Sequence, residues 1–407
     1  MNWKKKSVRT WGRLGMKCNW KELTLGDVTE LTIDYRGKTP KKLGGDWSQG
    51  GYPVLSAKNI KTGQIVQQDT IRFLNEEMYH KWMKDEIQKG DIIVTSEAPF
   101  GQILYWNSDE KIVLGQRLFG VRIKEGYDSK FIYYYMTTTA FQAEMDSRAT
   151  GTTVIGLRQP ELMKCRLYCP NIDTQRRISK VLMSIDEKIV LNNKINNNLH
   201  EQTIAVFNKY YDTSTNQQPF SSIINVLSGG TPKTSNLDFW NGTIPFFTPK
   251  DAGDLYTFQT EKYITDTGLN HCNSRLYPSN TTFVTARGTV GKVSLAGIPM
   301  AMNQSCYALT SDVIDPILVY FYTLKAIESL KHKASGAVFD AIVTRDFNSE
   351  IIKILSNTDS KRILAIVSPM LENIRNNVAE NMRLSTLRDT LLPHLMSGEL
   401  DVSDIDL

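Results

Sequence analysis

The apolar residues between Thr174 and Tyr211 recur at alternating spacings of four and three, with polar residues between them. This spacing is typical of one face of a long α-helix, close to a coiled-coil seam. Asp173 directly ahead is the expected N-cap, and no proline or glycine interrupts the run. At about 1.5 Å per residue the helix would be roughly 57 Å long, and its narrow apolar stripe needs a partner helix. The seam consists of Ile178, Leu182, Ile185, Ile189, Asn192, Asn196, Leu199, Thr203 and Val206.

A second stretch repeats this seam 185 residues later in the same chain. Asn192 and Asn196 map onto Asn377 and Asn381, so the polar layer repeats as well. Two unrelated core helices would explain the apolar positions but not the matched asparagines, so the repeat favours a duplicated protein with a two-helix spacer. Asparagines in a seam penalise wrong registers, whereas the alternative interpretation is solvent exposure in mid-helix. We expect the second helix to stop at Pro393, after roughly 50 Å. Its apolar seam positions are Ile363, Val367, Met370, Ile374, Leu384 and Leu391.

The segment ahead of each helix repeats the same order of features. The first contains a loop rich in glycine and lysine over 34–51, strand patterns at 90–95, 103–106, 112–114 and 118–123, and an aromatic-rich helix pattern over 130–145. In the second segment, residues 229–232 correspond to residues 37–40, Gly291 to Gly101 and Gln304 to Gln116. A helix pattern over 316–331 corresponds to the aromatic helix. The two halves therefore share a plan but differ in the side chains on their loops.

The repeat predicts an α+β protein with two pseudo-repeated globular domains, each followed by a long helix. At 407 residues, each repeat of about 185 residues is long enough to bury its own core. The expected division is a basic extension over 1–19, a first domain over 20–172, its helix over 173–212, a second domain over 213–357, its helix over 358–400, and an acidic tail over 401–407.

Composition describes an ordinary soluble protein, with 41% hydrophobic residues and a mean hydropathy of −0.31. No apolar run approaches the ~20 residues that span a bilayer, and the N-terminus lacks the apolar segment of a signal peptide. The five cysteines are scattered and odd in number, which fits a reducing cytoplasm. Cys165 and Cys169 lack a nearby second pair or histidine, so we expect no zinc site there.

The net charge of +5 comes from the N-terminus, because residues 1–20 carry six basic residues and no acidic ones. Without them, 42 basic residues face 43 acidic ones, so the overall charge is no evidence for nucleic-acid binding. Met16 is an alternative start within this extension. A local basic patch does exist, since residues 36–61 contain six basic residues and one acidic residue.

No catalytic constellation is visible in the sequence. The segment 288–292 (GTVGK) is too short between its glycines for a phosphate-binding P-loop and lacks the following Ser or Thr. The Asn/Asp-Pro-Pro-aromatic tetrapeptide of amino-methyltransferases is absent, and the five histidines are dispersed. We therefore expect a chain that is not an enzyme and that holds no metal and no cofactor of its own.

Four segments resemble the specificity subunit of type I restriction-modification systems: 34–40 (DYRGKTP), 228–232 (SGGTP), 287–291 (RGTVG) and 387–400 (LRDTLLPHLMSGEL). The resemblance covers about residues 20–400 and omits the extension before Met16. It implies that each globular half is a target recognition domain for one half of a split site in double-stranded DNA. It implies that the helices pair as an antiparallel coiled-coil spacer, set the gap and dock two methyltransferase subunits, through which the restriction/translocase subunits join. S-adenosylmethionine, ATP and magnesium would be used by those partners.

DNA contacts are expected from Lys and Arg in open loops and from Gln, Asn or Arg that reach base edges. The phosphate candidates are Arg36, Lys38, Lys41, Lys42, Lys58 and Lys61 in the first half, and Lys233, Lys250, Arg287, Lys292 and Lys333 in the second. The base-edge candidates are Gln116, Arg117, Arg148, Asn303, Gln304 and Arg345. Each fits a solvated surface residue equally well, and the shared position of the two glutamines also fits a scaffold role.

Two other classes of function stay open from the sequence alone. A coiled-coil adaptor or scaffold without DNA specificity would suit the helices, but the local basic loops argue against it. A self-contained nuclease or methyltransferase would need the motifs that are missing.

Overall fold

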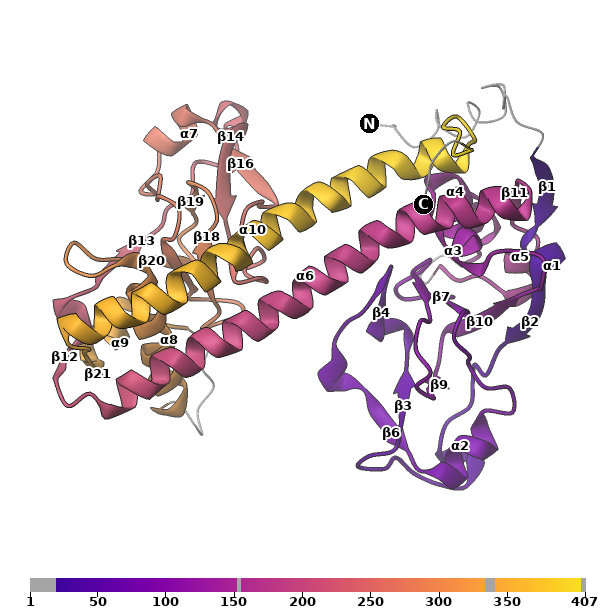
Figure 1. Cartoon of the computed structure of the whole chain (residues 1–407), viewed down its shortest axis with the longest axis horizontal. Helices are drawn as coiled ribbons and strands as arrows, with labels where there is room; N and C mark the ends of the chain where they lie inside the picture. Colours follow the sequence, from indigo (N-terminus) through magenta and orange to yellow (C-terminus); the bar gives the residue numbers. More distant parts are fainter. Residues whose placement is uncertain (1–19, 152–154, 334–340, 404–407) are drawn as a thin grey trace. The chain divides into compact units, whose positions relative to one another are not determined.

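The computed structural model describes residues 20–151, 155–333 and 341–403, so the basic extension over 1–19 and the end of the acidic tail lie outside the described residues. The chain divides into two compact units (Figure 1). Unit 1 comprises Met1–Glu187 and Leu384–Leu407, and unit 2 comprises Lys188–Arg383. Both boundaries fall inside long helices, α6 (Ile172–Thr213) and α10 (Asn357–Met396), so each unit contains a part of both helices.

Unit 1 is an α+β body whose strands form four small sheets, ordered β2-β10-β7-β8, β6-β3-β9, β1-β11 and β4-β5. Its strands are β1 (Lys21–Thr24), β2 (Thr29–Ile33), β3 (Tyr52–Leu55), β4 (Ile60–Lys61), β5 (Gln64–Ile65), β6 (Arg72–Leu74), β7 (Ile92–Thr95), β8 (Ile103–Tyr105), β9 (Val113–Leu114), β10 (Leu118–Ile123) and β11 (Arg166–Cys169). Its other helices are α1 (Leu25–Val28), η1 (Lys41–Leu43), η2 (Ala57–Asn59), η3 (Gln68–Thr70), α2 (Glu76–Trp82), α3 (Ser129–Thr137), α4 (Thr139–Arg148) and α5 (Gln159–Met163).

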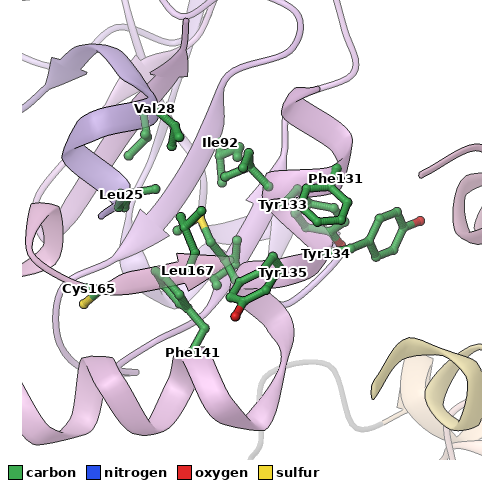
Figure 2. Close-up of a cluster of buried hydrophobic side chains, with 14 of the residues drawn as sticks. Leu25, Val28, Ile92, Phe131, Tyr133, Tyr134, Tyr135, Phe141, Cys165 and Leu167 are labelled. Atoms are coloured by element: carbon green, nitrogen blue, oxygen red, sulfur yellow. The ribbon is translucent and has the colours of Figure 1, made fainter. Parts of the chain in front are cut away.

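The main core of unit 1 lies between the four-stranded sheet, the aromatic helix α3 and the first turns of α6. Figure 2 shows Phe131, Tyr133, Tyr134 and Tyr135 of α3 gathered there with apolar residues of the strands. Six consecutive residues of α3 are buried, so this helix is covered on all sides, as expected for a helix that is apolar all round. A second core lies around β3, α2 and the other face of the sheet.

Unit 2 repeats the plan of unit 1 with sheets ordered β13-β20-β17-β18-β15, β16-β14-β19 and β12-β21. Its strands are β12 (Gln217–Pro219), β13 (Asn225–Ser228), β14 (Trp240–Phe247), β15 (Tyr256–Thr257), β16 (Lys262–Ile264), β17 (Thr282–Thr285), β18 (Val293–Ala296), β19 (Ala301–Met302), β20 (Cys306–Thr310) and β21 (Ile351–Lys353). Its other helices are η4 (Phe220–Ser222), η5 (Leu237–Phe239), α7 (Asp266–Asn270), α8 (Pro316–Lys333) and α9 (Thr344–Ser349). The order β13-β20-β17-β18 matches β2-β10-β7-β8, which confirms the predicted duplication.

Within unit 2 the helices α6 and α10 pack antiparallel through the predicted asparagine layer. Nδ2 of Asn192 donates to Oδ1 of Asn381 at 2.8 Å, and Nδ2 of Asn377 donates to Oδ1 of Asn196 at 2.8 Å. Asn192 and Asn196 are only 1% and 8% exposed, so the alternative of solvent-exposed asparagines is wrong for them. Asn192 also donates to Glu380 at 2.7 Å, and this hydrogen bond lowers the pKa of that carboxyl group.

Within unit 1 the same two helices are held to α3 by a polar network. The hydroxyl of Tyr134 donates to Asp186 of α6 at 2.6 Å, and Arg388 of α10 donates to the same carboxylate at 2.7 Å. Burial opposes the charge of Arg388, but the hydrogen bond and the attraction of Asp186 raise its pKa. The arginine of the LRDTLLP segment therefore serves to attach the end of α10 to the globular part of unit 1.

The ends of both long helices differ from the predicted ones. Helix α6 starts one residue before Asp173, and the side chain of Asn171 accepts the backbone N–H of Thr174 at 2.9 Å, so Asp173 lies in the first turn and is not the cap. Helix α10 passes through Pro393 and ends at Met396. A proline loses one helix hydrogen bond, which the burial of the apolar last turn in the core of unit 1 offsets.

The seam and the aromatic helix also need correction. Leu371 is fully buried and Met370 only partly, because α10 turns this face toward the core of unit 2. Phe207, which was not among the predicted seam residues, is likewise buried in that core, and the predicted Val206 packs against it half-buried. The predicted helix over 130–145 is two helices, since Thr138 ends α3 and caps α4. Of the other predicted seam residues, Ile178, Leu182, Ile185, Ile363, Val367 and Ile374 are buried, while Ile189, Leu199, Leu384 and Leu391 are half-buried.

The first prediction concerns a buried ion pair of unit 1. Arg122 of β10 donates to both carboxylate oxygens of Asp91, at 2.9 and 2.8 Å, and Asp91 is 2% exposed. Replacing Arg122 by Met should destabilise unit 1 by about 3 kcal/mol, because an uncompensated charge would stay buried. Urea unfolding measures this loss. Lys111→Met is the control, since the pair of Lys111 with Glu86 is exposed, and its unfolding midpoint should not move. Equal midpoints for the two variants would contradict the prediction.

Candidate nucleic-acid interface

Three loops of unit 1 are joined by backbone hydrogen bonds at the ends of its strands. The N–H of Ser96, after β7, donates to the carbonyl of Arg117, before β10, at 2.8 Å. The carbonyl of Ser96 accepts the N–H of Leu157 at 3.0 Å. The β7–β8 turn is closed by Thr95, whose N–H donates to the carbonyl of Gln102 at 2.9 Å and whose hydroxyl accepts the N–H of Gln102 at 2.8 Å. We call residues 95–102, 115–117 and 156–158 the loop frame of unit 1.

Unit 2 builds the same loop frame from residues 285–292, 303–305 and 341–343. The N–H of Ala286 donates to the carbonyl of Ser305 at 2.8 Å, and its carbonyl accepts the N–H of Ile342 at 2.9 Å. Thr285 closes the β17–β18 turn with Lys292 by the same two hydrogen bonds, each 3.0 Å long. Since the bonds match one by one, each of these residues of one frame has an equivalent in the other.

The matched glutamines of the two frames are used differently. Gln304 accepts a hydrogen bond from the hydroxyl of Thr231, in the loop after β13. That loop lies close against the frame at Gly229. A Cβ at this position would come within 2.1 Å of the carbonyl oxygen of Asn303, so only glycine allows so close an approach. Gln116 is exposed and has no side-chain partner within the part of the chain that the structure describes. A scaffold role therefore fits Gln304 and does not fit Gln116.

Three cations of the loop over 34–51 contact their own unit. Arg36 donates to Asp34 at 2.8 and 2.9 Å and lies over the ring of a buried phenylalanine of β10. The ammonium of Lys38 donates to the carbonyl of Trp82, and burial lowers its pKa. Lys42 donates to a carbonyl of its own loop at 2.8 Å. These contacts hold the loop in place and leave fewer donors for a phosphate.

Two arginines proposed as base readers also have acidic neighbours. Arg148 at the end of α4 lies 3.3 Å from Glu144 and 3.8 Å from Glu161, and its side chain is 27% exposed. This places it in a structural cluster. Arg117 pairs with Glu97 at 3.1 Å, but its side chain is 46% exposed and lies in the loop frame.

In unit 2 the candidate lysines divide in a similar way. Lys250 pairs with Glu261 at 3.2 Å in solvent, where such a pair contributes little. Lys292 donates to a backbone carbonyl at 3.1 Å. Lys333 at the end of α8 pairs with the buried carboxylate of Glu350. Its ammonium compensates the negative charge of that carboxylate, which would be costly to bury unpaired. Asn303 accepts a backbone N–H of the frame through its side chain.

Seven candidates keep their side chains available for a ligand. They are exposed, and no hydrogen-bond or ion-pair partner is found for their side chains among residues 20–151, 155–333 and 341–403. Arg287, Arg345 and Gln116 lie in or beside the loop frames, whereas the others lie on neighbouring loops. The seven are Lys41, Lys58, Lys61, Gln116, Lys233, Arg287 and Arg345.

Glu97 lies in the loop frame of unit 1 as the partner of Arg117, although its acidic side chain placed it outside the basic and amide residues expected at a DNA surface. The sequence does carry a signal for this position, since Thr95 and Thr285 are each followed two positions later by a charged residue, Glu97 in one half and Arg287 in the other. The described residues contain no group of three or more His, Cys, Asp and Glu side chains placed to hold a metal ion. None of the helices in the described ranges is long and apolar enough to cross a membrane.

Known proteins resemble this chain over nearly its whole length. The family model described as the type I restriction modification DNA specificity domain matches residues 17–201 and again 219–384. The MjaIX specificity subunit of Methanocaldococcus jannaschii is 20% identical, over 95% of both chains. The HindI specificity subunit of Haemophilus influenzae is 22% identical, over 94% of this chain and 100% of its own. A solved S subunit of a type I restriction-modification system from M. genitalium shares the fold, with a TM-score of 0.58, 16% identity and coverage of 94% of this chain and 98% of that one.

The fold defines a two-domain protein in which matched loop frames are carried by two units that share a pair of long helices. The chain belongs to the family of type I restriction modification DNA specificity proteins and carries two copies of their domain. The predicted fold class and family are thereby confirmed. Proteins of this family are the DNA-recognition components of type I restriction-modification complexes, which implies DNA binding and assembly with other subunits of such a system.

Proposed function

We propose that each unit of this specificity subunit reads one half of a bipartite target in double-stranded DNA. The observation that carries the proposal is the pair of loop frames, which have the same backbone hydrogen bonds but different exposed side chains. A frame that is kept while its side chains vary suits a reader of sequence, because the backbone contacts position the loops and the side chains select the bases.

The paired helices α6 and α10 act as the spacer between the two readers and as the docking surface for two methyltransferase subunits. Their 42 and 40 residues correspond to about 63 and 60 Å of helix. Half-site centres on the order of one to one and a half DNA turns apart fit such a spacer, given ~34 Å per turn. The restriction/translocase subunits join through the methyltransferases.

The chain itself is not an enzyme in this proposal. S-adenosylmethionine, ATP and magnesium belong to the partner subunits, and the contribution of this chain is the choice of DNA sequence. Support comes from the sequence, in which no nucleotide, methyltransferase or metal motif was found. The working place of such a complex is the cytoplasm, where the DNA and the partners are.

Reconstitution tests the proposed function. The purified chain alone should neither methylate nor cut DNA, whereas the same chain with its methyltransferase subunits should methylate adenines at one bipartite sequence. Sequencing that detects methylated bases on randomised DNA measures the target. Methyl transfer by the lone chain would overturn the assignment of chemistry to the partners. Methylation by the complex without any sequence preference would favour an adaptor in place of a reader.

A further inference from the structure

The two loop frames present residues of opposite charge at one matched position. Glu97 follows Ser96, whose N–H and carbonyl bind Arg117 and Leu157. Arg287 follows Ala286, whose N–H and carbonyl make the equivalent bonds to the other two loops of its frame. Glu97 and Arg287 also form the same isolated bridge, the first with Gly156 and the second with Ala341. The backbone therefore places Glu97 and Arg287 at equivalent positions of the two frames, where their side chains carry opposite charges.

In unit 1 the carboxylate of Glu97 at this position is paired with a donor from another loop of the frame, Arg117. A carboxylate oxygen of Glu97 lies 3.1 Å from Nε of Arg117, and the two side chains are 36% and 46% exposed. Arg117 has a φ of 68°, in the left-handed region that costs a non-glycine residue about 1–2 kcal/mol. Strained residues of this kind persist where surrounding contacts fix them, and they gather at ligand sites. The carbonyl of Arg117 accepts the N–H of Ser96, and this hydrogen bond fixes the strained backbone that carries the side chain.

In unit 2 the same position carries a single cation. Arg287 is exposed, and its guanidinium has no ion-pair or hydrogen-bond partner within the described part of the chain. The residue equivalent to Arg117 is Ser305, a small side chain that cannot pair with it as Arg117 pairs with Glu97. The guanidinium fork is therefore free to bind a planar acceptor pair.

We propose that Glu97 with Arg117 and the matched Arg287 are specificity-determining residues, each reading a G·C pair in the half-site of its own unit. Arg287 would donate its fork to O6 and N7 of guanine. Glu97 would accept from N4 of cytosine while Arg117 donates to O6 of the paired guanine. These two base atoms lie side by side in the major groove, which suits an acceptor and a donor 3.1 Å apart. The inference rests on the proposed function, because it assumes that each unit reads DNA.

The test replaces each residue by glutamine in the complete reconstituted complex. Arg287→Gln should change one base position in the half-site of unit 2, where the preference for G·C falls roughly 5- to 150-fold and A·T gains, because glutamine matches adenine. Glu97→Gln should lower the preference at one position in the half-site of unit 1 by a similar factor. Each variant should leave the half-site of the other unit unaltered. Methylation rates on a DNA library with every target position varied, at fixed salt, measure both effects.

Two controls make the same charge changes outside the frames. Arg275→Gln removes an exposed arginine of unit 2, and Glu110→Gln removes an exposed carboxylate of unit 1. Both should leave the target unchanged. Arg287→Gln, Arg275→Gln and Glu110→Gln should melt with the wild type because these side chains are exposed, and Glu97→Gln should melt close to it because its ion pair with Arg117 is open to solvent. If Arg287→Gln slows methylation of every sequence equally, the residue contacts phosphate and the inference is overturned; an effect no larger than that of Arg275→Gln also overturns it. A wild-type complex without a bipartite target would refute the proposed function itself, whereas a bipartite target unaltered by the variants refutes only this inference.

Discussion

Exchanging residues 20–170 for the equivalent domain of another family member is expected to replace one half-site of the DNA target and to leave the other half-site intact. The segment is a natural cassette, because β1 at its start pairs with β11 at its end, with Lys21 opposite Cys169. It contains the loop frame of unit 1 and stops before α6, so the helix pair is unchanged. The reading side chains therefore move together with the backbone that positions them.

The matching experiment exchanges residues 216–354 of unit 2, where Ile354 donates its N–H to the carbonyl of Asn216 at 2.8 Å and closes the segment in the same way. This chimera should change the other half-site. Both targets are obtained by sequencing methylated bases on randomised DNA in the reconstituted complex. A wild-type chain carried through the same reconstitution is the control. Alteration of both half-sites by either single exchange would show that the units do not read DNA independently.

The long helices could be predicted from the sequence because their signal is local and periodic. Apolar spacings of three and four over nearly forty residues fit no regular secondary structure other than a helix. The matched asparagines identified the second long helix as its partner. The apolar run of β10 likewise coincides with the predicted strand over 118–123. Such patterns are properties of neighbouring residues, so one sequence is enough to read them.

Errors arose where tertiary packing decides between locally equivalent choices. Thr138 ends one helix and caps the next, with its hydroxyl accepting the N–H of Phe141, although no proline or glycine marks the break. Leu371 and Met370 are adjacent and both apolar, and only contact with the core of unit 2 selects Leu371. Pro393 normally signals a helix end, but the buried turn after it outweighs one lost hydrogen bond.

The candidate interface was the least predictable part, because the availability of a charge depends on residues distant in sequence. Lys38 binds a carbonyl 44 positions away, and Lys333 neutralises a carboxylate 17 positions away. A count of local charges cannot separate these cations from exposed ones such as Lys58. The pairing of Glu97 with Arg117 joins two loops that only the folded sheet brings together.

A matched double insertion in the helix pair is expected to lengthen the unread gap of the target by one or two base pairs while both half-sites persist. The insertions are four residues after Asn193 in α6 and four after Val378 in α10. Four residues add about one helical turn, roughly 6 Å, compared with ~3.4 Å per base pair. Both sites lie between the two asparagine layers, so Asn192 can still pair with Asn381 and the second layer also survives.

A single insertion should behave differently from the double one. It lengthens the distance between the layers on one helix only, so no register satisfies both, and the buried amides of one layer lose their partners at a cost of about 1–3 kcal/mol each. We therefore expect weaker binding without a sharp new gap. The measurement is methylation of a DNA library in which both half-sites are fixed and the gap varies base by base. If the double insertion kept the preferred gap of the wild type, the helices would be a docking surface that does not set the distance between the half-sites.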